Sequence, residues 1–162
     1  MPDAEDQPAR GYPIVLTSLR GALAVVVGGG PVGERKVRGL LAAGVAVRLI
    51  SPAATQQIQA WAEGGQLGWK PRAYAEGDLA GARLAFAATN QRAVNAQVAR
   101  DAAALGLLCN VADAPAEGNF HLPAVHRGGG MTIAVSTDGA SPARAAELRD
   151  QIADWLAEDT SE

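Results

Sequence analysis

The chain has 162 residues, of which 48% are hydrophobic and 19% charged, with a formal net charge of −3. This length suits one domain, or one domain and a fragment, and the hydrophobic share excludes an intrinsically disordered chain. The negative charge argues against a general nucleic-acid or membrane-surface binder. A single cysteine excludes an intramolecular disulfide framework and any multi-cysteine metal site within one chain, so we expect no bound metal.

The sequence predicts a soluble protein. Its apolar runs are too short to cross a membrane, so we expect no membrane partner. Residues 1–10 are acidic and lack the positively charged start and the apolar run of a signal peptide, which favours a cytoplasmic location. Residues 1–10 and 159–162 are expected to form frayed tails.

The first part of the chain alternates strand-like and helix-like segments. The continuous apolar run Ala22–Val27 predicts a strand that is buried on both faces. Further strands are predicted at Val45–Ile50, Leu67–Lys70, Leu84–Ala88 and Leu107–Val111, of which Leu84–Ala88 and Leu107–Val111 are expected to lie in the core. Apolar residues at helical spacing predict helices between them, at Pro31–Ala43, Ala53–Glu63 and Gln91–Leu105. This alternation predicts an α/β fold for residues 1–112, a Rossmann-type parallel sheet with helices on both faces.

The pattern changes in residues 113–162. Two apolar segments, Phe120–Val125 and Met131–Ser136, are joined through glycines with no helix between them, which predicts a β-hairpin. Ser141-Pro142 then predicts the start of an amphipathic helix, whose apolar residues include Leu148, Ile152, Trp155 and Leu156. A hairpin and one helix are marginal as an independent core. We therefore expect a small α+β dimerisation segment and a homodimer.

The strongest motif joins the first predicted strand to the first predicted helix, and it consists of Gly28, Gly29, Gly30, Pro31, Val32 and Gly33. Three glycines at this spacing, in a strand–helix–strand unit, predict dinucleotide binding. The first glycine permits a tight turn, the second lets the backbone approach a pyrophosphate, and the third permits close packing of helix and strand. The helix N-terminus supplies N–H groups for the anion.

The dinucleotide fingerprint lacks one expected residue. An Asp or Glu that binds the ribose is expected after the second strand, where this chain has Ser51-Pro52. Ser51 offers a hydroxyl but no carboxylate. Arg48 can meet a 2′-phosphate, or it can be a packed or solvent-facing side chain. The residues alone leave NAD and NADP open.

Further candidates follow the fourth and fifth predicted strands, where ligands bind in open parallel sheets. Thr89 and Asn90 can line the nicotinamide side of a cofactor or cap the next helix, and both roles are compatible. Asp113 can serve as a general base, although an Asp before Ala-Pro is also an ordinary turn residue. Cys109 is predicted to be a core residue, and His121 and His126 are predicted to be hairpin residues.

Five segments, in this order, carry a resemblance to a known family: GGGPVGERKVRGLLAAGVAVRLISP, ATN, CNVADAP, FHLPAV and MTIAVSTDGASPARAAELRDQI. Over residues 12–157 the chain resembles the precorrin-2 dehydrogenase (siroheme synthase N-terminal) family. The resemblance implies NAD-dependent oxidation of precorrin-2, a tetrapyrrole, to sirohydrochlorin by a homodimer in siroheme biosynthesis. Some members also insert ferrous iron, and this activity stays open because many relatives continue into a further helical region or a fused methyltransferase.

The resemblance also implies roles for individual residues. Asp113 matches the catalytic aspartate of the family. Cofactor contacts fall on Gly30, Pro31, Val32, Ser51, Pro52, Ala53 and Thr89. The predicted substrate-binding residues are Asn110, Ser136, Thr137, Ser141 and Arg144, and Thr137 stands where another serine occurs in relatives. The alternative function is an NAD-sensing Rossmann module without turnover, which explains the glycine motif but not CNVADAP or STDGASP.

Overall fold

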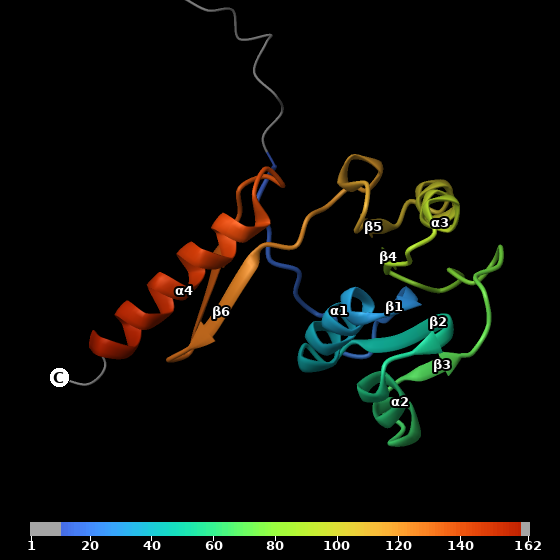
Figure 1. Cartoon of the computed structure of the whole chain (residues 1–162), viewed down its shortest axis with the longest axis horizontal. Coiled ribbons are helices and arrows are strands. Elements are labelled where there is room, and N and C mark those ends of the chain that lie inside the picture. The colour runs from blue at the N-terminus through green and yellow to red at the C-terminus, as the bar shows by residue number, and fades with distance from the viewer. Residues whose placement is uncertain (1–10, 160–162) are drawn as a thin grey trace, which may run out of the picture. The chain divides into compact units, whose positions relative to one another are not determined.

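The computed structural model describes residues 11–159, which form two compact units (Figure 1). The larger unit spans residues 15–120, and the smaller unit comprises residues 11–14 and 121–159. Of the tails expected at residues 1–10 and 159–162, residues 1–10 and 160–162 lie outside the described residues, and Asp159 is the last residue of a helix. Residues 113–120, assigned from the sequence to the second segment, belong to the larger unit. One reason is that Asn119 Oδ1 accepts a hydrogen bond from Cys109 N at 2.7 Å.

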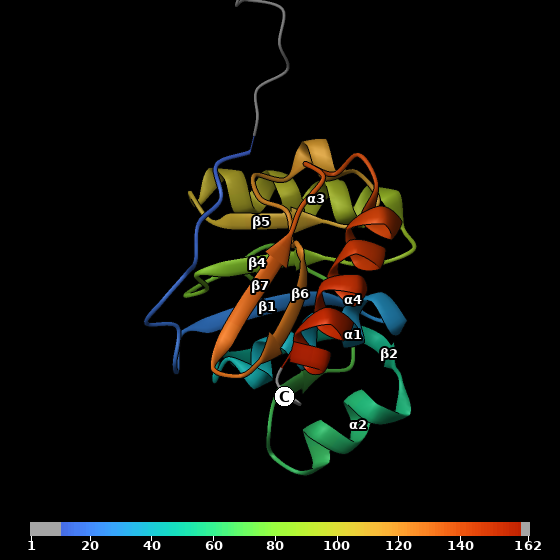
Figure 2. The same ribbon diagram turned by 90° about the vertical axis from the view of Figure 1, so that its left-hand side faces the viewer.

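The larger unit is a five-stranded parallel sheet with strand order β3-β2-β1-β4-β5, which confirms the predicted Rossmann-type sheet (Figure 2). Its strands are β1 (Leu23–Gly29), β2 (Ala46–Ala54), β3 (Gly68–Lys70), β4 (Leu84–Ala87) and β5 (Leu108–Val111). Its helices are α1 (Pro31–Ala42), α2 (Gln56–Glu63), α3 (Arg92–Ala104) and the short 3₁₀ helix η2 (Pro115–Glu117). The chain runs outward from β1 to β3 and then crosses to β4. The strand order therefore reverses between β1 and β4.

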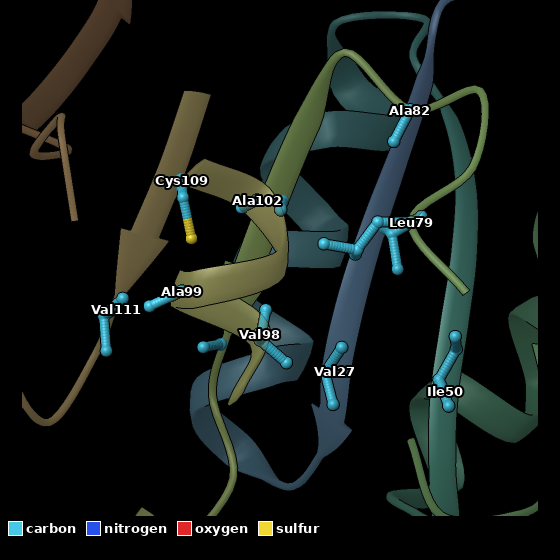
Figure 3. Close-up of a cluster of buried hydrophobic side chains, with 12 residues drawn as sticks. Val27, Ile50, Leu79, Ala82, Val98, Ala99, Ala102, Cys109 and Val111 are labelled. Carbon is cyan, nitrogen blue, oxygen red and sulfur yellow. The ribbon is translucent and has the colours of Figure 1, made fainter. Parts of the chain in front are cut away.

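Helices cover both faces of this sheet, as predicted. On one face, Val98 and Ala102 of α3 pack in one buried cluster with Val27 and Ile50 (Figure 3). On the other face, α1 and α2 pack against alternate residues of the same strands, in a cluster that includes Val26, Val37, Leu49 and Ile58. Burial on both faces explains why the central strands are continuous apolar runs.

Strand β2 is longer than predicted, and α2 begins later. The sequence placed a break at Ser51-Pro52 and a helix from Ala53, but β2 continues to Ala54 and α2 starts at Gln56. The pairing of β1 with β2 shifts register after Val27, so that Gly29 pairs with Ala54. Pro52 lies beyond the last residue of β2 that pairs with β3. Thr55 caps α2 by accepting a hydrogen bond from Ile58 N at 3.3 Å.

Residues 71–83, between β3 and β4, are fixed by one buried carboxylate. Asp78 is 5% exposed and accepts hydrogen bonds from both terminal nitrogens of Arg72 at 2.6 Å, and from Lys70 Nζ at 3.3 Å. The Arg72 guanidinium holds the pKa of Asp78 well below its usual value. Arg48 donates to the carbonyl oxygen of Asp78 at 3.2 Å. Arg48 thus has hydrogen-bond partners within the chain, which favours a packed side chain over a 2′-phosphate ligand.

The smaller unit contains the predicted hairpin and helix. Its antiparallel strands are β6 (Ala124–Gly128) and β7 (Met131–Val135), and its helix is α4 (Pro142–Asp159). The first strand begins at Ala124 rather than at Phe120. Helix α4 lies along the hairpin (Figure 1). Within residues 11–159, no helix is both long enough and apolar enough to span a membrane.

Candidate active site

The glycine motif forms a tight turn that touches the loop after β4. Gly28 has φ of +115°, which favours glycine, and a Cβ there would lie 2.4 Å from the carbonyl oxygen of Ala88. A Cβ at Gly33 would lie 1.9 Å from the carbonyl oxygen of Gly28. Both contacts are with backbone, which cannot move aside cheaply. Gly28 and Gly33 therefore have the turning and packing roles that the motif predicts.

Gly30 differs from its neighbours because the space beside it is open. Within the described chain, a Cβ at Gly30 would meet no heavy atom within 4 Å beyond its adjacent residues. Gly30 is the N-cap residue of α1, Pro31 is the first helical residue, and no side chain of residues 11–159 caps this helix. The first-turn N–H groups of Val32 and Gly33 can therefore meet an anion in that space. This is the cradle that a pyrophosphate requires.

Ser51 supports the glycine turn from the side of β2. Its Oγ accepts a hydrogen bond from Gly29 N at 3.0 Å, and the residue is 9% exposed. Pro52 and Ala53, which follow it, are exposed. The structure gives Ser51 a structural contact that the sequence did not predict. Contact of Ser51, Pro52 and Ala53 with a cofactor stays a prediction.

On the other side of the glycine turn, the loop after β4 is held by Asn95. This residue is fully buried on α3. Its Oδ1 accepts hydrogen bonds from Thr89 N at 3.1 Å and Thr89 Oγ1 at 2.7 Å, and its Nδ2 donates to Thr89 O at 3.0 Å. The N-cap residue of α3 is Gln91, not Thr89 or Asn90, although Thr89 Oγ1 does accept from Gln91 N at 3.1 Å.

Asp113 follows β5 at the same edge of the sheet, and its side chain is 36% exposed. Arg92 Nη1 donates to Asp113 Oδ1 at 2.9 Å, and Arg92 Nη2 donates to Glu117 Oε2. Partial burial raises the pKa of Asp113, but hydrogen bonds from Arg92, from Asn95 and from the backbone together outweigh it. The pKa of Asp113 thus lies below its usual value of 3.8, and the carboxylate is ionised at neutral pH.

These groups follow successive strands at the carboxyl edge of the sheet. Ser51 belongs to β2, the glycine turn ends β1, Thr89 follows β4 and Asp113 follows β5. The strand order reverses at the centre of this row, which is where open α/β sheets bind ligands. An anion cradle and an ionised carboxylate on one edge suit a dinucleotide and a step that needs a proton acceptor.

Other predicted site residues have structural partners. Asn110 is buried and its Nδ2 donates to Phe120 O at 3.1 Å. In the smaller unit, hydroxyl oxygens accept backbone N–H groups: Ser136 from Asp138, Thr137 from Ser141, and Ser141 from Arg144. Arg144 is exposed. Substrate contact of these residues stays a prediction. Cys109 is buried, as predicted, and burial raises the pKa of its thiol to about 11.

Sequence reasoning missed Asn95 and Arg92. Asn95 did carry a signal, because it is a polar residue within the apolar face of α3 that includes Val98 and Ala102. A buried amide needs partners, so such a position predicts a hydrogen-bonding role. Arg92 carried no signal of this kind, since an arginine at the start of an exposed helical turn is ordinary.

Comparisons with known proteins found two matching family models and several similar relatives. A family model described as "Putative NAD(P)-binding" matches residues 15–124, and one described as "Sirohaem biosynthesis protein central" matches residues 129–154. Siroheme synthases of Nitrosococcus oceani and Pseudomonas putida are 38% and 39% identical over 138 residues, which are 85% of this chain. The chain spans 30% of the length of these two relatives.

One solved structure is similar over most of its own length. SirC, a precorrin-2 dehydrogenase, matches with a TM-score of 0.74 and 33% sequence identity. The match covers 92% of this chain and 71% of that chain.

Proposed function

Because the chain belongs to the precorrin-2 dehydrogenase (siroheme synthase N-terminal) family, we propose that it oxidises precorrin-2 to sirohydrochlorin with NAD. The observation that carries this proposal is the row of groups along one sheet edge, from the glycine turn to Asp113. The reaction belongs to siroheme biosynthesis, and we place it in the cytoplasm. The further activities of the longer siroheme synthases are not part of the proposal.

The residues of the glycine turn fit a dinucleotide. The open space at Gly30 and the uncapped first turn of α1 accommodate the pyrophosphate, with Val32 and Gly33 as N–H donors. The ribose lies with Ser51, Pro52 and Ala53, and the nicotinamide side with Thr89 and Asn90. When bound, NAD supplies the hydride acceptor for the oxidation.

Asp113 is the proton acceptor of this proposal. Loss of two hydrogens from the substrate releases one as hydride and one as a proton, so the site needs a base as well as the cofactor. Asp113 is ionised at neutral pH and half-exposed, so it is available to accept that proton.

We assign binding of the tetrapyrrole carboxylates to residues of the smaller unit, namely Ser136, Thr137, Ser141 and Arg144. Contact of Asn110 with the substrate is a separate assignment within the larger unit. Each of the three hydroxyls accepts a backbone N–H and can still donate its own proton to a carboxylate. The N-terminus of α4 favours negative charge, and the substrate carries several carboxylates.

We also infer a homodimer. The smaller unit has one hairpin and one helix, and it exposes large apolar side chains, with Trp155 63%, Met131 52% and Leu122 50% exposed. So small a unit has little core of its own, and a second copy of the same chain can cover this apolar surface.

An anaerobic assay with precorrin-2 and NAD tests the proposal. We expect NADH and sirohydrochlorin from the wild-type chain, and a loss of about 10²–10⁴-fold in kcat for Asp113→Asn, since a general base contributes that much. Glu76→Gln, which removes an exposed carboxylate of the same unit, is the matched control and keeps full activity.

The same assay separates the alternatives. Binding of NAD without oxidation of precorrin-2 would favour the NAD-sensing module. Full activity of Asp113→Asn would remove Asp113 from the chemistry. A parallel reaction with sirohydrochlorin and ferrous or cobaltous ion reports metal insertion independently of the oxidation.

A further inference from the structure

Arg92 joins two carboxylates that follow β5. It is the first residue of α3, Asp113 follows β5, and Glu117 ends η2, so one guanidinium links three separate elements. We propose that Arg92 is the positioning residue of Asp113, holding that carboxylate ionised and in place, while Glu117 limits how strongly it does so. This inference rests on the proposed function, in which Asp113 is the base.

The backbone position of Arg92 is fixed by neighbouring contacts. Asn95, one turn further along α3, is buried and fixes the backbone of Thr89 just before the helix. The start of α3 is therefore set by the same contacts that shape the cofactor loop. The guanidinium is planar and presents its donors as a rigid fork, so its two terminal nitrogens can serve two acids at once.

The exposure of the three side chains suits a group that must react. Arg92, Asp113 and Glu117 are 44%, 36% and 45% exposed. A fully buried pair would lock the carboxylate, whereas a half-exposed pair is screened by water and can open when substrate arrives. Glu117 further weakens the interaction of Arg92 with Asp113, because it accepts a hydrogen bond from one of the two terminal nitrogens of Arg92.

Three groups from two elements act on Asp113. Arg92 and the amide of Asn95 come from α3 and both favour the ionised carboxylate. Glu117 comes from η2 and shares the Arg92 guanidinium with Asp113, so we expect its like charge to disfavour that ionised form. Removal of Arg92 should therefore raise the pKa of Asp113, and removal of the Glu117 charge should lower it. The two substitutions should shift the pKa of Asp113 in opposite directions. This distinguishes the proposed arrangement from a general loss of structure.

The first test measures the carboxyl group directly. In the chain without cofactor, carbon-13 NMR follows the titration of Asp113, whose signal is identified by its loss in Asp113→Asn. We expect Arg92→Gln to raise the pKa of Asp113, since a cation that favours the ionised carboxylate is lost, and Glu117→Gln to lower it. Arg92→Lys should lie between wild type and Arg92→Gln, because an ammonium cannot fork to both acids.

Arg100→Gln is the matched control. Arg100 lies on the same helix and donates to Gln97 Oε1 at 2.6 Å, eight residues or about 12 Å along α3 from Arg92. The Arg100→Gln substitution removes the same charge as Arg92→Gln, so it reports the effect of net charge alone. The pKa of Asp113 should be unchanged in this variant.

The second test follows the pH dependence of kcat. In Arg92→Gln the acidic limb of the profile should move to higher pH by the same shift that NMR records for Asp113. If the pKa of Asp113 in Arg92→Gln equals that of the wild type, the inference is overturned. If the KM for precorrin-2 is also raised in that variant, Arg92 binds the substrate instead. Failure of the wild-type chain to oxidise precorrin-2 would instead refute the proposed function.

Discussion

The side-chain amide of Asn95 binds the backbone of Thr89 in both directions. Oδ1 accepts from Thr89 N at 3.1 Å and Nδ2 donates to Thr89 O at 3.0 Å. The backbone of the loop after β4, which we propose to face the cofactor, is thus hydrogen-bonded by a residue that lies fully inside the protein. A buried amide with both ends paired is a rigid support, because each unpaired group would cost free energy.

We expect Asn95→Leu, which keeps the side-chain volume, to lower the free energy of unfolding by about 1–3 kcal/mol, since it leaves Thr89 N–H and C=O without their partner. Affinity for NAD should fall with it. Chemical denaturation and calorimetric titration with NAD measure the two effects. Gln57→Leu, on the exposed side of α2, is the control, and equal stability of both variants would contradict the supporting role of Asn95.

The glycines of the cofactor turn should respond to alanine in two different ways. Gly33→Ala places a Cβ 1.9 Å from a backbone oxygen, so we expect a marked loss of stability. Gly30→Ala meets open space, so the chain should fold normally and bind NAD weakly, because the methyl group occupies the place of the pyrophosphate. Thermal unfolding and NAD titration separate these outcomes. Normal NAD affinity in a folded Gly30→Ala variant would refute the cradle.

Asp78 should make stability depend on pH. Its pKa is lowered in the folded chain by Arg72, so its stabilising effect is complete above the unfolded value of 3.8 and is lost as the pH falls toward the folded value. At pH 7, Asp78→Asn should lower the free energy of unfolding by about 1–3 kcal/mol, because it removes the charge that accepts hydrogen bonds from the half-exposed Arg72 and Lys70. Below pH 4 the difference from wild type should shrink. A constant difference from pH 7 to pH 2, measured by denaturant unfolding, would contradict this account.

Trp155 should matter for association rather than for folding. Trp155 lies on α4 and is 63% exposed, so Trp155→Glu removes little packing within the chain. We expect light scattering after size exclusion to give a dimer for wild type and a shift toward monomer for Trp155→Glu. Arg149→Glu, which changes a charge on the same helix, separates the loss of apolar surface from a change of charge. A monomeric wild-type chain at working concentration would rule out the dimer.

Most of the fold was predictable because its signals are local. Runs such as Ala24–Val27 indicate strands buried on both faces, and Pro31 and Ser141-Pro142 mark helix starts that the structure confirms. The end of β2 was predicted wrongly, because proline usually interrupts a strand. Here the register shift at Gly29 and the short β3 allow the strand to continue past Pro52.

The site was predictable only in part. The glycine spacing and the position of Asp113 after β5 follow from the pattern of strands. The partners of these residues do not, since the contact of Arg92 with Asp113 joins positions 21 residues apart and that of Ser51 with Gly29 joins positions 22 residues apart. Such pairings depend on how strands align, which a pattern of apolar residues does not specify.

The two apolar clusters of the larger unit share their central strands. Along β1, Ala24 and Val26 contribute to one cluster while Val25 and Val27 contribute to the other. Unfolding of either helical layer would remove the packing from one face of these strands. The larger unit should therefore unfold in a single cooperative transition. The proposed cofactor site is built from the ends of the same strands. It is therefore an all-or-none property, complete in every folded copy and absent from every unfolded one.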